Sequence, residues 1–559
     1  VLALARPEVF EVFPRLWAER QNVQEIRLQE LGRKAGERLV RQVLGDHIGP
    51  ETLERLVRHA GGNAFYLEEL IRAAAEGKDH ALPDTVLAMV ETRLGRLTVE
   101  ARRVLRAASV FGEVCWEGGV AVLLAGAMTA AAVADWLSRL AEQELLAIRP
   151  HSRVPGEREL AFRHALLREG TYATLTEDDK RLGHRLAGTW LADHGESDPM
   201  VLAGHFERGG EGERAAEFYL RAAEQAQYAA ADVDATMARV RLGLACAPSR
   251  DLRIRLLGIR CEVSTFNLEN INATIADAEA LAREAPRGSI PWVQGVMPYN
   301  YGMLVAGRID ELLASLAALR EVDPTPDAVA KMAYALLLGI CAVDNLGRVA
   351  DGTALEKRCV AIIPPTADRD PLAHVWWNIA IGMRASYAHD DPWAGLQHAS
   401  AIQAIFRVTS GELIFLNMQL FRALNFWYLG ELTEAELVHE SIVPADETLG
   451  MVASLRRFSL AWLRADRGEL DAAHATAAQL SQHGQAIRNT LDEGRGRWVL
   501  AEVLRRKGDL SGAERELGVA LGMTIPLEYP GALGTLSALR LAQGRPAEAL
   551  AVAEDAMAR

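Results

Sequence analysis

The residues in this sequence that could do chemistry do not form the usual phosphate-binding or metal-binding patterns. No GxxxxGK(S/T) loop occurs, and no apolar strand ends in paired acids. Those elements cradle a triphosphate and hold its magnesium ion. We therefore expect that this chain by itself does not hydrolyse ATP.

The cysteines are odd in number and no two of them form a CxxC pair. This spacing argues against a disulfide framework or a zinc site, and it favours a reducing cytoplasm. The five cysteines are Cys115, Cys246, Cys261, Cys341 and Cys359.

Composition and charge limit the kinds of partner. A net charge of -14 argues against a general nucleic-acid-binding face, because attraction to phosphates needs clustered Lys and Arg. The most apolar stretch, residues 118–134, lies at the short limit for spanning a bilayer. We expect two helices broken near Gly126 instead, with no membrane partner and no signal peptide.

The chain is predicted to be mostly α-helical and to contain several domains or repeats. Ala, Leu, Glu and Arg dominate, and these are strong helix formers. Aromatic residues make up only 6%, and a length of 559 residues is too great for a single core.

The beginning of the chain predicts part of a buried sheet. Val1 to Ala5 form a continuous apolar run, as in a parallel strand, and Arg6 stands at its carboxyl end. A helix or loop at 9–20 and an edge strand at 23–28 follow. A buried strand needs neighbours, so we expect a truncated chain whose missing sheet lies upstream. It ends on AVAEDAMAR, a helix without a C-cap, so we expect truncation there too.

Residues 30–196 predict helices and one hairpin. Two helices within 30–59 are separated by Gly45 and Gly49-Pro50, and GGNAFYLEELIR (61–72) is a Gly-Gly turn leading into another helix. Amphipathic helices are predicted at 82–97, 100–112 and 133–146, followed by short strands at 146–148 and 160–162. This is the order of a winged helix. Its third helix, DWLSRLAEQELL, is acidic or neutral, which argues against DNA binding.

From residue 197 onward, the sequence predicts a stack of two-helix repeats. Turns at Gly430, Gly468, Gly508 and Gly544 recur every 36–40 residues. Gly307, Gly347, His389 and Asn270 fit the same step, and a similar motif stands at Gly210. The repeats resemble tetratricopeptide repeats. We expect a small residue after each turn to allow close packing, namely Ala435, Ala472, Ala513 and Ala547.

Several motifs in residues 1–190 together resemble one protein class. They are LARPEVFEVFPRLWAER, GGNAFYLEEL, LPDTVLAMVETRL, RVLRAASVFGE and ELAFRHALLREGTY. They resemble the end of the ATPase module of STAND proteins, the signal-transduction ATPases related to AAA+ proteins. The likeness is to bacterial regulators with C-terminal tetratricopeptide repeats, often fused to an N-terminal serine/threonine kinase.

The resemblance implies four domains. They are the end of the nucleotide-binding α/β domain (1–29), a helical lid (30–80), a winged helix (81–196) and the repeats (197–559).

The resemblance also implies ATP or ADP as the cofactor, with magnesium in the full-length parent, and three nucleotide contacts. Arg6 matches the sensor arginine that reads the terminal phosphate; a loop salt bridge is the alternative. Gly62, Asn63 and Ala64 match a Gly-x-Pro turn against the adenine, with Ala64 in place of proline; a plain helix cap is the alternative. His164 in FRHA matches the histidine of a Met-His-Asp motif that touches the diphosphate; a packed histidine is the alternative.

The function implied is a nucleotide-gated switch with a repeat sensor that binds a protein or peptide in its groove. The upstream ATPase domain, and a possible kinase domain, would be partners in the same chain. The alternatives are a repeat scaffold with a degenerate ATPase half, the regulatory tail of an upstream kinase, and part of an ATP-dependent transcriptional regulator.

Overall fold

The computed structural model describes residues 30–45, 48–75, 93–228, 232–265, 271–363, 370–409, 412–442, 450–486, 489–523 and 528–558. The chain forms two compact units, Val1–Gly195 and Glu196–Arg559. The strands predicted within 1–28, including Arg6, lie outside the described residues, as does most of the helix predicted at 82–97.

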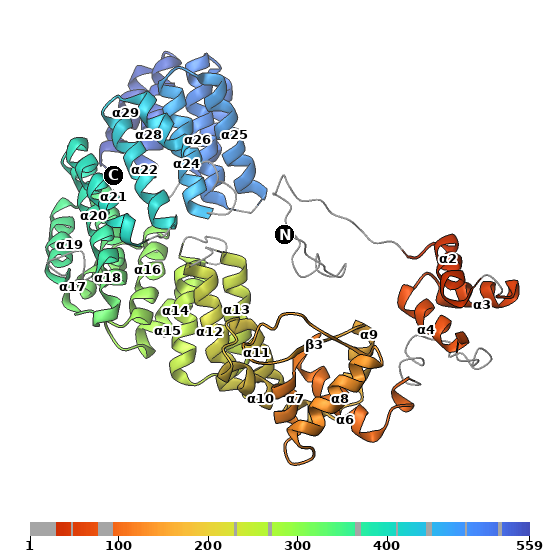
Figure 1. Cartoon of the computed structure of the whole chain (residues 1–559). Coiled ribbons are helices and arrows are strands. Elements are labelled where there is room, and N and C mark those ends of the chain that lie inside the picture. The colour runs from red at the N-terminus through yellow and green to blue at the C-terminus, as the bar shows by residue number, and fades with distance from the viewer. Residues whose placement is uncertain are drawn as a thin grey trace. The chain divides into compact units, whose positions relative to one another are not determined.

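Three short helices form the first described part of unit 1 (Figure 1). Pro50 stands at the first turn of the second helix, where its missing N–H costs nothing. Their shared core contains Val40, Leu56, Leu67 and Leu70. The helices predicted within 30–72 are thereby confirmed. Their bounds are Arg33–Leu44 (α2), Pro50–Ala60 (α3) and Ala64–Ala75 (α4).

The rest of unit 1, residues 93–195, is called the sheet module here. Its three antiparallel strands have the order β1-β3-β2, with Val114 opposite Ala161 and Leu146 opposite Phe162. The hairpin strands were predicted; β1 was not. Gly126 separates α7 from α8, as predicted. The elements are Val99–Phe111 (α6), Val114–Trp116 (β1), Glu117–Leu123 (α7), Ala130–Glu142 (α8), Leu146–Ile148 (β2), Glu159–Phe162 (β3), Ala165–Ala173 (α9) and Glu177–Asp193 (α10).

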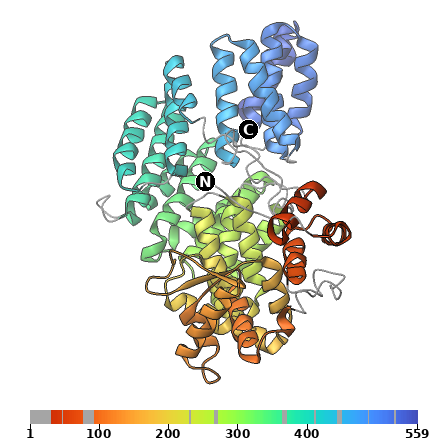
Figure 2. The same ribbon diagram turned by 45° about the vertical axis from the view of Figure 1, so that its right-hand side comes forward.

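Unit 2 is a row of antiparallel helices, which Figures 1 and 2 show side by side. From α14 to α28 the even-numbered helices contact one another in sequence. Their bounds are Pro199–Arg208 (α11), Gly212–Tyr228 (α12), Val233–Ala245 (α13), Arg250–Ser264 (α14), Ile271–Glu284 (α15), Ile290–Val305 (α16), Ile309–Glu321 (α17), Pro326–Ala328 (η2), Val329–Asn345 (α18), Val349–Ile362 (α19), Pro371–Ala388 (α20), Pro392–Thr409 (α21), Glu412–Tyr428 (α22), Leu432–Glu440 (α23), Gly450–Asp466 (α24), Leu470–Ala486 (α25), Thr490–Lys507 (α26), Leu510–Leu521 (α27), Tyr529–Ala542 (α28) and Pro546–Ala558 (α29).

Most hairpin turns use one residue in the left-handed region. At Gly508, φ is +87°, and the following Asp509 N–H donates to the Leu504 carbonyl at 3.0 Å. This six-to-one hydrogen bond is a Schellman cap, which favours glycine because a Cβ is strained there. The same arrangement occurs at the other turn glycines of the period, whereas Asp390 takes the left-handed position after α20. The turn glycines are Gly307, Gly347, Gly430, Gly468 and Gly544.

A buried small residue lies five positions after five of the six turn glycines, whereas the fifth residue after Gly307 is the buried Leu312. Ala435 and Ala513 are buried as predicted. Ala472 is half-buried and Ala547 is exposed, so the prediction is wrong at these two positions. The buried residues there are Ala473 and Ala549, and Ala473 lies in one core cluster with Ala461 and Ala465 of the preceding helix α24. At the equivalent Gly352, the Asp344 carboxylate occupies the space of a Cβ.

The Gly210 motif occupies a different position in the hairpin order from the later turn glycines. Three helices, α12 to α14, lie between it and the predicted turn at Asn270, which is itself outside the described residues. Gly210 therefore precedes an even-numbered helix, whereas the later glycines follow one.

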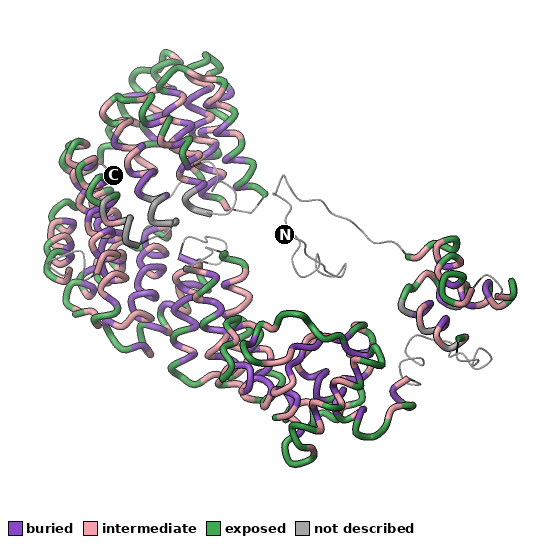
Figure 3. Tube along the Cα trace, in the orientation of Figure 1, coloured by how far each residue is buried: buried purple, intermediate pink, exposed green. Residues whose placement is uncertain are grey.

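Buried residues line the helix faces that meet a neighbour (Figure 3). Among the described residues one helical segment, Pro326–Asn345, is long and apolar enough to cross a membrane, but 61% of its apolar window is buried. Met332, Leu336 and Ile340 in this segment are fully buried in the repeat core. Packing against neighbouring repeats therefore accounts for its apolar character.

Replacing the buried small residues should disturb the hairpins locally. We expect Ala473→Leu and Ala513→Leu to cost roughly 1–3 kcal/mol each through overpacking. The matched control Ala472→Leu changes the neighbouring, half-buried position and should cost less. Hydrogen exchange should accelerate in the altered hairpin and its neighbours, while the sheet module keeps its protection. Cooperative unfolding of the entire chain would contradict a repeat architecture.

Acid should weaken the repeats because two buried histidines must stay neutral. Burial lowers the pKa of His205 and of His439 to about 4 each. The charges of Arg456 and Arg464 lower the pKa of His439 further, and Arg208 does the same for His205. Since an unfolded histidine titrates near 6.5, stability is fully present above that pH and falls as the pH drops from about 6.5 to about 4. Each histidine contributes at most about 3 kcal/mol to this loss.

We expect His439→Gln to flatten the pH dependence of the unfolding midpoint of the repeats. The control is His151→Gln, which changes an exposed histidine of unit 1 and should leave that dependence unaltered. A parallel loss of stability in wild type and His439→Gln between about pH 7 and about pH 4.5 would show that this histidine is not the titrating group.

Candidate functional site

Of the predicted nucleotide contacts, the structure describes the Gly-Gly-Asn turn and His164. Gly61 and Gly62 have φ of +52° and +81°, which glycine adopts without strain. The Leu31 N–H donates to the Gly62 carbonyl at 2.8 Å, and a Cβ on Gly62 would lie 2.7 Å from the Cβ of Glu30. The turn therefore needs glycine for both its conformation and its close packing.

Asn63 caps helix α4. Its Oδ1 accepts a hydrogen bond from the Tyr66 N–H at 3.0 Å, which satisfies one of the free amides at the helix start. Ala64 is the first residue of the helix. The cap is a structural role, and the adenine contact predicted for these residues stays a prediction.

One face of α4 carries Ala64, Glu68 and Arg72. Residues four apart in a helix lie on the same side, so the Glu68 carboxylate stands one turn, roughly 6 Å along the axis, from the start of the helix. The four-residue spacing can be read from the sequence. The residues that this helix face contacts are known only from the structure.

His164 stands at the junction between β3 and α9. Its backbone is extended, and its side chain makes no cap to the helix. The ring Nε2 lies 3.6 Å from the Glu68 Oε2, and 18% of the side chain is exposed. The structure therefore brings His164 to the face of α4 whose first residue is Ala64.

Four charged residues close a ring beside His164. The Glu144 carboxylate lies 2.7 Å from the Arg72 guanidinium and 3.0 Å from that of Arg163. The Glu68 carboxylate lies 3.4 Å from Arg72 and 3.9 Å from Arg163. Each arginine thus faces both carboxylates. We call Glu68, Arg72, Glu144 and Arg163 the four-charge ring; two members come from α4 and two from the sheet module.

The charged residues of this site shift the pKa of His164 in opposite directions. Burial lowers the pKa of His164, the Glu68 carboxylate opposes this, and three nearby arginines lower it further. The arginines are Arg163, Arg93 and Arg72. A histidine with a lowered pKa is neutral near pH 7, and a neutral imidazole donates one hydrogen bond. A hydrogen bond from Arg163 and its charge lower the pKa of Glu144, with Arg72 contributing less.

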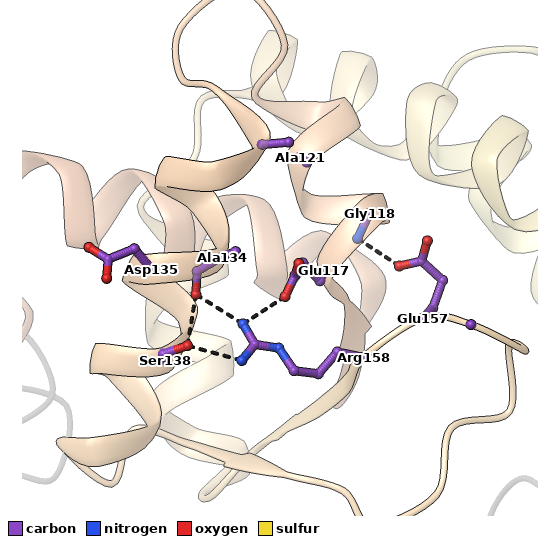
Figure 4. A pocket seen from close by; sticks show the side chains of 10 residues that line it. Glu117, Gly118, Ala121, Ala134, Asp135, Ser138, Glu157 and Arg158 are labelled. Atoms are coloured by element: carbon purple, nitrogen blue, oxygen red, sulfur yellow. Dashed lines mark hydrogen bonds and ion pairs between the residues drawn. The ribbon is translucent and has the colours of Figure 1, made fainter.

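An open hollow of about 570 Å³ lies elsewhere on the sheet module, between α7, α8 and the hairpin loop (Figure 4). Arg158 crosses it, paired with Glu117 at 2.6 Å and donating to the Ser138 hydroxyl at 3.0 Å and to the Ala134 carbonyl at 2.9 Å. The Gly118 N–H donates to the Glu157 carboxylate at 2.8 Å. These contacts tie the hairpin loop to the two helices.

Polar side chains in unit 2 mainly connect successive helices. The Gln294 amide donates to the Glu262 carboxylate at 2.6 Å, and Lys331 pairs with the same carboxylate. Arg384 is only 2% exposed and pairs with Asp344 at 2.8 Å. Burial raises the pKa of Asp344 although the arginine opposes it. Such pairs fix how neighbouring repeats sit on one another.

Sequence reasoning missed the four residues of the ring. Three of them could have been identified from their positions in the sequence. Arg163 adjoins His164, and Glu68 and Arg72 share one helix face with Ala64. Glu144 carried none, because it follows α8 in sequence and reaches the site only through the fold. Its φ of +57° is left-handed, which a non-glycine residue adopts rarely.

No protein-family model and no curated protein matches the chain. Two solved structures share its helical character. A STAND protein with a tetratricopeptide repeat sensor from Pyrococcus horikoshii is 13% identical over 96% of this chain and 73% of that one, with a TM-score of 0.35. The APC/C hetero-tetramer Cut9–Hcn1 is 12% identical over 95% of this chain and 99% of that one, with a TM-score of 0.41. Likenesses of this size do not establish a family or a function.

The cap at Asn63 gives a test of how α4 is held. We expect Asn63→Ala to cost about 1 kcal/mol of local stability and to speed hydrogen exchange in the first turns of α4. Asn63→Asp keeps an oxygen acceptor and serves as the matched control. Equal exchange in both variants would mean that contacts along the helix, rather than the cap, fix its start.

Proposed function

We propose that this chain is the regulatory and protein-interaction portion of an ATP-binding signal-transduction protein. In this proposal residues 30–80 are a helical lid, residues 81–196 are a winged-helix switch arm, and residues 197–559 are a tetratricopeptide-like sensor. Residues 1–29 would complete a nucleotide-binding domain that lies upstream.

A single juxtaposition carries the proposal. His164 and the face of α4 that begins at Ala64 meet through Glu68, although about a hundred residues separate them in sequence. Two segments that the family resemblance links to a nucleotide thus lie at one place in the fold.

The donor set suits a phosphate. Arginine guanidinium groups bind phosphate oxygens through paired hydrogen bonds, and a neutral histidine adds one donor. Arg72, Arg93, Arg163 and His164 would face such an anion. Among the described residues no group of three or more His, Cys, Asp or Glu side chains could hold a metal ion. We therefore assign the magnesium of the intact parent no ligands in the described part of this chain.

The sheet module is proposed to act without nucleic acid. In winged-helix proteins that bind DNA, the third helix enters the major groove and needs basic side chains. Here Asp135 on α8 pairs with Arg139 at 2.9 Å, and Glu117 and Glu157 border the adjoining hollow. These carboxylates would repel a phosphate backbone.

The repeats are proposed to bind a protein or peptide, and the fused partner is proposed to be a serine/threonine kinase in a cytoplasmic protein. Stacked hairpins present an extended surface of many helices, which suits an extended ligand. The scaffold with a degenerate ATPase half and the ATP-dependent transcriptional regulator remain the alternative functions. A measurement of nucleotide binding distinguishes the scaffold from the nucleotide-gated switch.

The nucleotide proposal predicts weak binding of ADP by the purified chain and no release of phosphate from ATP. His164→Ala should weaken ADP binding about fivefold, as the loss of one hydrogen bond implies. Isothermal titration calorimetry at constant salt measures this, with the exposed His151→Ala as control. Equal affinity of wild type and His164→Ala would make the histidine a packing residue, and absence of ADP binding would favour the scaffold.

A further inference from the structure

We propose that Arg72 and Arg163 bind phosphate at the same site as His164, and that Glu68 and Glu144 occupy them until an anionic ligand displaces the carboxylates. This inference rests on the proposed function. It adds an internal competitor for the two arginines, so that ligand binding and the ion pairs of the four-charge ring exclude each other.

The geometry supports a competition. Glu68 Oε1 lies 3.4 Å from Arg72 and 3.9 Å from Arg163, while Glu68 Oε2 lies 3.6 Å from His164. One carboxylate therefore faces all three cationic or donor groups, as a phosphate oxygen set would. An anion that bound all three groups from this position would displace that carboxylate.

The second carboxylate completes the ring from the opposite side. Glu144 presents Oε2 to Arg72 at 2.7 Å and Oε1 to Arg163 at 3.0 Å. It thereby links α4 to the end of α8 and to the β3–α9 junction. The charges of the ring cancel, and Arg93, which also acts on His164, adds one positive charge.

The ring is accessible enough to open. Its side chains are between 31% and 50% exposed, and ion pairs of such exposure are weak and sensitive to salt. A pyrophosphate group carries more negative charge than either carboxylate, and it would compete with both of them for the arginine pair. Binding would then replace the ion pairs of Arg72 and Arg163 with Glu68 and Glu144 by contacts to the anion.

The test uses the full chain and inorganic pyrophosphate, titrated by calorimetry at constant ionic strength. Glu68→Gln and Glu144→Gln keep the side-chain shape but remove the competing charge, and we expect about threefold to tenfold tighter binding than in wild type. Glu142→Gln is the matched control: it removes the same charge two residues from Glu144, at an exposed position outside the ring. Circular dichroism and thermal midpoints establish that each variant is folded.

Arg163→Gln in the Glu68→Gln background should abolish the gain. Equal affinity of wild type, Glu68→Gln and Glu144→Gln would overturn the competition while leaving a phosphate site intact. Absence of binding in every variant would overturn the proposed function and this inference together.

Discussion

The structure depends on one constraint: a two-helix hairpin of this sequence cannot bury its apolar face by itself. Each hairpin of unit 2 gains its core from the hairpins on either side. Helix α18 shows this most clearly, because an apolar segment that could enter a bilayer is covered by neighbouring repeats. The turn glycines serve this stacking because they end one helix sharply. The next helix then starts at an angle that brings the fifth residue after the glycine against the preceding helix.

Unit 1 is held by different forces. The sheet module has a conventional apolar core beneath its three strands, and α2–α4 have a separate small core. Charged groups, namely the four-charge ring, link α4 to the sheet module. A link made of exposed ion pairs responds to salt and to anionic ligands, whereas a core responds to neither in the same way. This difference is consistent with the proposal that unit 1 switches and that unit 2 presents a binding surface.

Electrostatics and packing also distinguish the two candidate places on unit 1. The large hollow of the sheet module is crossed by Arg158, whose hydrogen bonds hold the hairpin loop in place. The neighbourhood of His164 holds the convergent cationic groups instead. The chemical character of the side chains, and not the size of the cavity, points to the candidate site.

The sequence by itself determined the helical class, the repeat period and the turn glycines, because these depend on residues that are close along the chain. A glycine fixes its own backbone angle, and helical periodicity is a property of each segment. Only the tertiary structure decided that β1 pairs with β3, that Ala473 and not Ala472 faces the preceding helix, and that Glu144 closes a ring with residues of α4. A strand of three residues has no recognisable sequence pattern without its partner strand. Packing decides which of two adjacent helix residues is buried. An ion pair between distant segments forms only once folding has brought them together.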